Sequence, residues 1–196
     1  LLTVFQQYGD VDYIQVAIAA LESLGGQRSP SELLLKLDYQ IQHILVDEFQ
    51  DTSSSQFDLL KKLVDGWDEH NEANPQTPKT LFVVGDGMQS IYGFRAANVG
   101  LFLEAKKYGV NNLSLDDLPL SVNFRSRPVL VDWINKTFYK AFPQVDNISR
   151  GAVRYESSSA FKPSSDISEV TINGFFGESS SKIEADYIVN LVKKIQ

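Results

Sequence analysis

Short apolar runs and stretches with helical spacing follow one another along this chain. The runs at 43–47 and 80–84 are rich in β-branched and aromatic residues and predict two buried strands. Weaker strand signals lie at 118–122 and 170–176. Strands that alternate with helices predict an α/β fold with a largely parallel sheet. Apolar residues three and four apart predict the helices, at 4–24, 30–37, 54–67, 98–108, 128–142 and 181–196.

Polar residues mark where these elements begin and end. The run 29–32, Ser-Pro-Ser-Glu, predicts a capping box with Pro at the first helical position, and Ser181 with Glu184 predicts another cap. Thr52 and Ser53 can cap a helix that presents an apolar face. The segments 68–79 and 151–168 predict irregular structure, the first because it is polar and carries two prolines. The apolar face after Ser53 consists of Phe57, Leu60, Leu63, Val64 and Trp67.

The composition narrows the class of protein. A chain of 196 residues, 43% hydrophobic and 22% charged, has the size of one ordinary domain or two small ones. The absence of Cys excludes disulfides, thiol catalysis and Cys-based metal sites, and two isolated His residues argue against a His-based site. No apolar run approaches the ~20 residues that a membrane-spanning helix needs.

The charge is unevenly distributed. The net charge of −7 argues against a nonspecific coat on nucleic acid, but residues 119–163 hold seven basic and three acidic side chains. Such a segment can contact phosphates, or it can be a solvated basic face. Charge alone leaves both interpretations open.

The first candidate for chemistry is the pair of acids at the end of the run at 43–47. Asp47 and Glu48 stand at the carboxyl end of a predicted strand, where α/β sheets bind ligands. Side chains alternate along a strand, so the two carboxylates share a site only if the strand ends between them. Nucleotide hydrolysis requires one carboxylate at Mg²⁺ and another that orients the attacking water. The alternative is two exposed acids at a strand end.

The second candidate follows the run at 80–84, where glycines are followed by an amide, two aromatic residues and an arginine. Gln89 can hydrogen-bond a phosphate or a water molecule, and Tyr92 and Phe94 can stack on bases without sequence preference. The alternative interpretation places both aromatic rings in the core.

The third candidate is 123–128, Asn-Phe-Arg-Ser-Arg-Pro, at a predicted junction of strand and helix. The Phe124 ring is suited to stacking, and the Arg125 guanidinium to the charge of a γ-phosphate. The alternative is a surface arginine paired with a nearby acid.

Taken together, the three segments resemble motifs II, III and IV of superfamily 1 DNA helicases of the UvrD/Rep type. The resemblance rests on 46–52 (Val-Asp-Glu-Phe-Gln-Asp-Thr), on Gly85-Asp86 with 89–95 (Gln-Ser-Ile-Tyr-Gly-Phe-Arg), and on 123–126. The continuation through 127–135 looks closest to the RecB/AddA-like helicase–nuclease branch. This resemblance implies a RecA-like P-loop NTPase fold, a parallel sheet with flanking helices, truncated and followed by the start of a second such domain. The expected domains are 1–114, with motifs II and III, and 115–196, with motif IV.

The resemblance also implies roles for single residues, with ATP and Mg²⁺ as cofactors. Asp47 and Glu48 would hold the metal, and Glu48 would activate the hydrolytic water. Gln89 would sense the γ-phosphate, and Arg125 would be the arginine finger. On the nucleotide side, Phe124 would stack near the adenine, Arg95 would tie its loop to the nucleotide, and Gln50 would buttress the interface between domains. The implied DNA-binding residues are Tyr92, Phe94 and Asn123.

Some residues depart from the family pattern. Gly87-Met88 stand where more polar residues are usual, and 96–98, Ala-Ala-Asn, replace a common Gly-Ala-Asp. Phe stands at 94 and 124 in place of the commoner Tyr or Trp, which still permits stacking. These changes lie beside the predicted DNA loop and leave the acidic pair intact.

No Gly-Lys dipeptide occurs in the chain, so the phosphate cradle Gly-x-x-x-x-Gly-Lys-[Ser/Thr] is missing. We therefore expect an internal fragment of a cytoplasmic, ATP-dependent DNA helicase or translocase that is inactive by itself. Single-stranded or duplex DNA and other subunits of a helicase–nuclease complex are the expected partners, and no membrane is expected. The alternative is a non-catalytic, helicase-like module that binds DNA or a partner chain.

Overall fold

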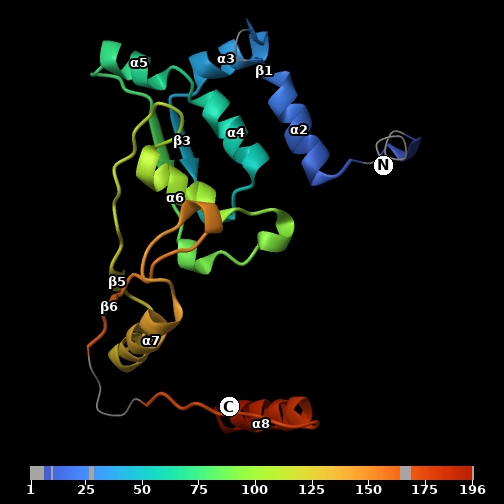
Figure 1. Ribbon diagram of the computed structural model, residues 1–196, viewed down its shortest axis with the longest axis vertical. Coiled ribbons are helices and arrows are strands. Elements are labelled where there is room, and N and C mark those ends of the chain that lie inside the picture. Colours follow the sequence, from blue (N-terminus) through green and yellow to red (C-terminus); the bar gives the residue numbers. More distant parts are fainter. Residues whose placement is uncertain (1–6, 10, 27–28, 164–168, 196) are drawn as a thin grey trace. The chain divides into compact units, whose positions relative to one another are not determined.

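The computed structural model describes residues 7–9, 11–26, 29–163 and 169–195 (Figure 1). The chain divides into two compact units. Unit 1 comprises Leu1–Leu120 with Phe138–Ser157, and unit 2 comprises Ser121–Thr137 with Ser158–Gln196. The domain boundary expected between residues 114 and 115 stays a prediction.

Unit 1 is built around a parallel pair of strands, β3 (His43–Val46) and β4 (Thr80–Val83). The strands pair in register from His43 opposite Thr80 to Val46 opposite Val83. Helices α4 (Ser54–Leu63) and α5 (Trp67–Ala73) lie on the connection between them. The predicted α/β class is therefore confirmed as a mixed fold with short parallel strands.

The core of unit 1 lies on one face of this strand pair. Helix α6 (Val99–Tyr108) and α4 contribute side chains to it, and the strands contribute every second residue. Trp67 at the start of α5 and Val110 beyond α6 are completely buried. The buried cluster consists of Phe49, Phe57, Leu60, Val64, Trp67, Ala105 and Val110, with Ile44, Val46, Leu81 and Val83 packed against it.

The other face of the strand pair is exposed, which corrects the prediction of two fully buried strands. Leu45 is 70% exposed and Phe82 is 52% exposed. The runs are continuously apolar, but among the described residues helices cover only the face of Ile44 and Leu81. A continuous apolar run therefore predicted the strands correctly and their burial incorrectly.

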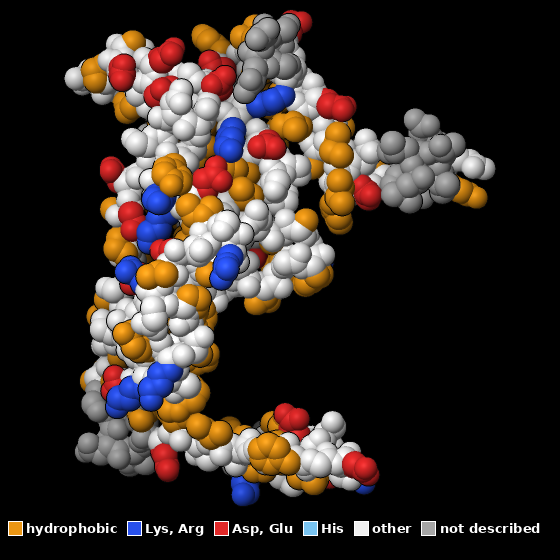
Figure 2. All heavy atoms as spheres, viewed as in Figure 1, with side chains coloured by type: hydrophobic (Ala, Val, Ile, Leu, Met, Phe, Trp, Pro, Cys, Tyr) orange, Lys and Arg blue, Asp and Glu red, His pale blue; other side chains and the backbone are white. Residues whose placement is uncertain are grey.

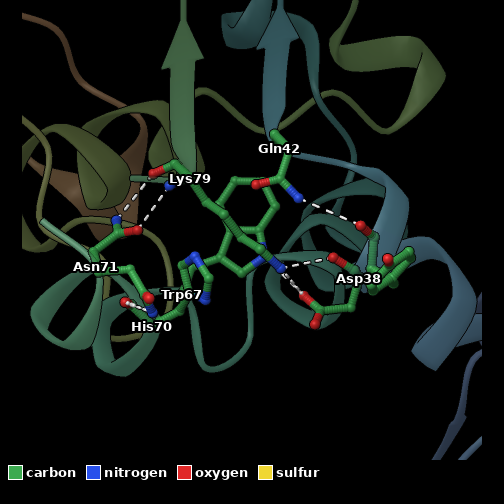
Figure 3. A network of polar contacts seen from close by, with 8 residues as sticks. Asp38, Gln42, Trp67, His70, Asn71 and Lys79 are labelled. Carbon is green, nitrogen blue, oxygen red and sulfur yellow. Dashed lines mark hydrogen bonds and ion pairs between the residues drawn. The ribbon is translucent and has the colours of Figure 1, made fainter. Parts of the chain in front are cut away.

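The prediction of a loop over 68–79 is also wrong in part, because α5 occupies its first half. A network of polar contacts holds this region (Figure 3). The Asn71 side chain accepts from the main-chain N of Lys79 at 2.8 Å and donates to its O at 2.9 Å. The Lys79 side chain is 5% exposed, and its Nζ lies 2.5 Å from Asp38 Oδ1 and 5.5 Å from the Trp67 ring centroid. Trp67 Nε1 donates to the same Asp38 oxygen at 3.2 Å.

Helix starts follow the capping residues with two corrections. Of the two predicted caps, Thr52 and Ser53, the structure uses Ser53 as the N-cap of α4, and Gln56 completes a capping box with it. Helix α3 (Glu32–Gln40) begins after Ser31, whose side chain accepts from Leu34 N, and it ends later than predicted. Ser29–Pro30 is not the predicted cap, because it forms strand β2, antiparallel to β1 (Gly25–Gly26).

The first predicted helix is shorter than its apolar spacing indicated. Helix α2 spans Tyr13–Ser23, because Asp12 caps it by accepting from Gln15 N at 2.6 Å. A turn at Gly9, with φ of +69°, separates α2 from residues 7–8. Residues 4–6 and 10 of that prediction lie outside the described residues.

Unit 2 contains a second parallel pair, β5 (Val122–Asn123) and β6 (Ser159–Ala160). The strand predicted at 118–122 therefore shrinks to a two-residue element, and part of the predicted irregular segment 151–168 supplies its partner; residues 164–168 lie outside the described residues. No strand forms over 170–176, because alternation alone provides no pairing partner.

Two long helices follow the sequence pattern more closely. Helix α7 spans Pro128–Ala141, with residues 128–137 in unit 2 and 138–141 in unit 1. Helix α8 spans Ser180–Ile195, so Ser181 lies inside its first turn and is not the predicted cap. Hydrophobic side chains are exposed along α2 and α8 (Figure 2), and neither helix has a buried residue. No helix in the described part of the chain is long and apolar enough to cross a membrane.

Candidate functional site

The acidic pair lies directly after β3. The strand ends at Val46, one residue earlier than predicted, so both acids lie beyond its end. Glu48 adopts a left-handed backbone conformation with φ of 51° and ψ of 40°. Strand alternation therefore does not apply to Asp47 and Glu48, which are both exposed. Asp47 Oδ1 accepts from Glu48 N at 2.8 Å, and this contact fixes the turn that leaves the strand.

Gln50 lies behind the acidic pair, in the short 3-10 helix η1 (Phe49–Asp51). Its side chain is 1% exposed and is hydrogen-bonded at both ends. Nε2 donates to Glu48 Oε2 at 2.7 Å, and Oε1 accepts from the main-chain N of Asp86 at 3.0 Å. The amide therefore connects the segment after β3 with the segment after β4.

Asp86 extends this connection to Gln89. One carboxylate oxygen of Asp86 accepts from Met88 N at 2.9 Å, which caps the 3-10 helix η2 (Gly87–Gln89). The other oxygen accepts from Gln89 Nε2 at 2.8 Å. Glu48, Gln50, Asp86 and Gln89 thus form one hydrogen-bonded series, and three of these four were candidates from the sequence.

The aromatic candidates lie in the loop after η2. The 3-10 helix η3 (Gly93–Arg95) places the Tyr92 and Phe94 rings 5.8 Å apart. The Arg95 guanidinium lies 5.4 Å from the first ring centroid and 5.8 Å from the second. Tyr92 is 38% exposed and Phe94 is 80% exposed, so neither ring lies in the core. The loop thus presents an exposed cluster of two rings and one cation.

The loop is tied back to the chain that follows η1. The main-chain N of Asn98 donates to Thr52 O at 3.1 Å, and Ser53 forms an isolated antiparallel β-bridge with Ala97. The Ser90 hydroxyl donates to Asp51 Oδ1 at 3.3 Å. The aromatic cluster is therefore attached to the same segment as the acidic pair.

The remaining candidates belong to unit 2. The Asn123 side-chain oxygen accepts from Arg125 N at 3.0 Å and from Ser126 N at 2.8 Å, so it caps the turn before α7. The exposed Phe124 ring lies 4.7 Å from the Phe161 ring, and Lys162 Nζ donates to Arg125 O. The parallel pairing of β5 with β6 brings these two segments together, since Phe161 N donates to Asn123 O at 3.0 Å.

Reasoning from the sequence missed two contributors to these groups. Asp86 was part of the resemblance but received no role, although its place directly after an apolar strand was a signal. Phe161 lies in a segment predicted to be irregular, and no pattern in the sequence pointed to its pairing with Phe124.

The acidic side chains of the site suit one kind of metal ion. No group of three or more His, Cys, Asp or Glu side chains that could hold a metal occurs among the described residues. Mg²⁺ is commonly held by one or two carboxylates together with waters and substrate phosphates. Asp47 and Glu48, two exposed carboxylates at a strand end, fit that kind of incomplete site and do not fit an all-protein cage.

The open hollows of unit 1 lie elsewhere. One of about 700 Å³ is lined by Leu103, Lys106 and Lys107 of α6 and by residues 146–149, which include part of the 3-10 helix η4 (Ile148–Arg150). None of the sequence-predicted site residues lines it. The hydrogen-bonded series at the strand ends is therefore the better candidate site, because it holds the charged and amide groups.

These observations define unit 1 as an α/β unit that gathers carboxylate and amide side chains at the carboxyl ends of two parallel strands, where such folds bind ligands. A family model described as the UvrD/REP helicase N-terminal domain matches residues 1–108, more than half of the chain. The chain belongs to this family.

Its relatives are large helicase–nuclease proteins. The AddA protein of the ATP-dependent helicase/nuclease of Desulfitobacterium hafniense is 36% identical over 169 residues, which is 81% of this chain and 11% of the relative. The corresponding protein of Clostridium acetobutylicum is 31% identical over 85% of this chain and 12% of the relative. The RecB protein of the RecBCD enzyme of Chlamydia muridarum is 32% identical over 88% of this chain and 15% of the relative. The chain thus spans only a small part of each.

Proposed function

We propose that this chain is part of an ATP-dependent DNA helicase or translocase, in which ATP hydrolysis drives movement on single-stranded DNA. The observation that carries the proposal is the hydrogen-bonded series from Glu48 through Gln50 and Asp86 to Gln89. In this proposal unit 1 has a RecA-like P-loop fold, and residues 115–196 begin a second domain of the same kind. The names of the relatives, which are subunits of an ATP-dependent helicase/nuclease and of the RecBCD enzyme, support a role beside other subunits of such a complex. We place this role in DNA repair or recombination.

The proposed chemistry assigns separate roles to the two acids. Glu48 orients the attacking water and accepts its proton, and Gln89 at the other end of the series senses the γ-phosphate. Asp47 would hold Mg²⁺ with Glu48 and the phosphate oxygens, and the ion would neutralise charge on those oxygens. The chain has no Gly-Lys dipeptide, so these 196 residues do not supply the phosphate cradle.

Two further groups complete the proposal. The exposed rings of Tyr92 and Phe94 stack on single-stranded bases, which requires no particular sequence. In unit 2, Phe124 stacks on the base of the nucleotide, and Arg125 is the cation that stabilises charge in the transition state.

The test is ATP hydrolysis by the full-length protein, with and without single-stranded DNA, compared with its Glu48→Gln variant. The variant keeps the size of the side chain but cannot accept a proton, so we expect turnover to fall about 10²- to 10⁴-fold. Glu72→Gln changes an exposed acid on α5 and serves as the matched control, with turnover unchanged. DNA binding without ATP turnover in the wild-type protein would instead establish a non-catalytic module.

A further inference from the structure

Gln50 is a buried polar side chain whose orientation is fixed by its two partners. A main-chain N–H can only donate, so the group facing Asp86 N must be Oε1. Nε2 consequently faces Glu48 Oε2, a carboxylate oxygen that can only accept when ionised. Neither contact survives if the amide is turned over. The side chain therefore has one orientation, in which it holds the carboxylate of Glu48.

Gln50 packs closely against Gly85. A Cβ at Gly85 would lie 2.6 Å from Gln50 Oε1 and 3.2 Å from Gln50 N. Any other residue at position 85 would therefore displace the amide. The Ser90 hydroxyl donates to the main-chain O of Gln50 at 3.4 Å.

Glu48 in contrast is exposed, and its left-handed backbone removes it from the strand. Gln50 Nε2 is the side-chain donor that the structure shows on its carboxylate. Because Gln50 holds one carboxylate oxygen of Glu48, the same contact also fixes the direction of the second oxygen.

We propose that Gln50 is a positioning residue, which holds one carboxylate oxygen of Glu48 so that the other is presented to the attacking water. The inference rests on the proposed function, because Glu48 needs orienting only if it acts on a water molecule. It also gives Gln50 a role different from the buttress between domains that the resemblance implied. Through Asp86, the same amide makes the position of Glu48 sensitive to the loop that carries Gln89.

The experiment uses the full-length protein and the variant Gln50→Leu, which keeps the volume and removes both hydrogen bonds. We expect kcat of DNA-stimulated ATP hydrolysis to fall about 10- to 100-fold, the range found for residues that orient the ligands of a metal ion through hydrogen bonds. The Kd for the nucleotide should change less than about 3-fold, because Gln50 acts on the chemical step and not on binding. Val64→Ala, which opens a small cavity in the same core, is the stability control, with Tm lowered and kcat unchanged. Gln42→Leu, an exposed glutamine before β3, is the matched control for the substitution itself.

A double-mutant cycle separates positioning from a general structural effect. Glu48→Asp keeps a carboxylate but is too short to reach Gln50, so adding Gln50→Leu to it should lower kcat no further. A full additional loss in that background would overturn the inference. Gly85→Ala tests the same inference without changing Gln50, because the added Cβ displaces the Gln50 amide. This variant should lower kcat as Gln50→Leu does.

The two proposals fail in different ways. Wild-type protein without ATP turnover contradicts the proposed function, and with it this inference. Wild-type turnover that Gln50→Leu leaves unchanged contradicts the inference alone.

Discussion

The buried Lys79 and its partner Asp38 should respond unequally to substitution. Lys79 is almost fully buried, whereas the Asp38 side chain is 47% exposed. Asp38→Ala leaves the ammonium group with the main-chain O of residue 38, at 2.7 Å, and the Trp67 ring, and it removes the acceptor of Trp67 Nε1. Lys79→Met leaves a carboxylate that water can reach and that still accepts from Trp67. The main-chain contacts of Asn71 are untouched in both variants.

The burial and contacts of Lys79 and Asp38 give the size of the difference in the free energy of unfolding between the two variants. Removing one partner of a fully buried ion pair costs about 3–5 kcal/mol, and the exposure of Asp38 reduces this to about 2 kcal/mol. The lost acceptor of Trp67 Nε1 adds about 1 kcal/mol. Lys79→Met should cost no more than about 1 kcal/mol, because an apolar side chain of similar length replaces a buried charge. The free energy of unfolding should therefore fall about 2 kcal/mol further in Asp38→Ala.

Denaturant unfolding of the purified chain at neutral pH, followed by circular dichroism, measures this difference. The thermal midpoint of Asp38→Ala should lie about 4–8 °C below that of Lys79→Met, at about 2–4 °C per kcal/mol. The double variant should be more stable than Asp38→Ala, because it no longer buries an unpaired charge. Equal losses in the two single variants, or a larger loss in Lys79→Met, would refute the reasoning.

Two further predictions concern the loop after η2. Ala96 has a φ of +63°, so Ala96→Gly should raise the free energy of unfolding by about 0.5–1 kcal/mol, since relief of about 1–2 kcal/mol of strain exceeds the entropy that glycine adds to the unfolded chain. Chemical denaturation checks this, and Ala97→Gly, without a positive φ, should be destabilising. Phe94→Ala should weaken binding of a thymidine oligonucleotide to the full-length protein by about 1–3 kcal/mol in fluorescence anisotropy. Tyr39→Ala, an exposed ring on α3, should leave this affinity unchanged.

The sequence predicted elements best where local signals were strong. Thr52 and Ser53 indicated the start of α4, which Ser53 caps, and Pro128 indicated the start of α7. Helix α5 was missed because Trp67 is its one buried residue, so it shows no apolar period, and the prolines that suggested a loop lie beyond its end. Its position depends on Lys79 and Asp38, which are distant in sequence.

Strands and the site depended more on distant partners. The segment 170–176 alternates like a strand over most of its length, but a strand forms only where another strand pairs with it. In the candidate site, the prediction that Asp47 and Glu48 act there rests on their place at the end of an apolar run. The contact of Gln50 with Asp86 could not be predicted, because it joins residues 36 positions apart and depends on how β3 pairs with β4.

The register of β3 against β4 has a consequence for the site as well as for the core. A slip of one residue would turn Ile44 and Val46 out of the apolar cluster, because side chains alternate between the faces of a strand. The same slip would move Asp86 about 3.3 Å along Gln50, more than a hydrogen bond tolerates. The packing of the apolar residues thus sets the register of the strands, and this register aligns Gln50 with Asp86, whose single hydrogen bond is too weak to set it. The same pairing of β3 with β4 is consequently required for the core of unit 1 and for its candidate site.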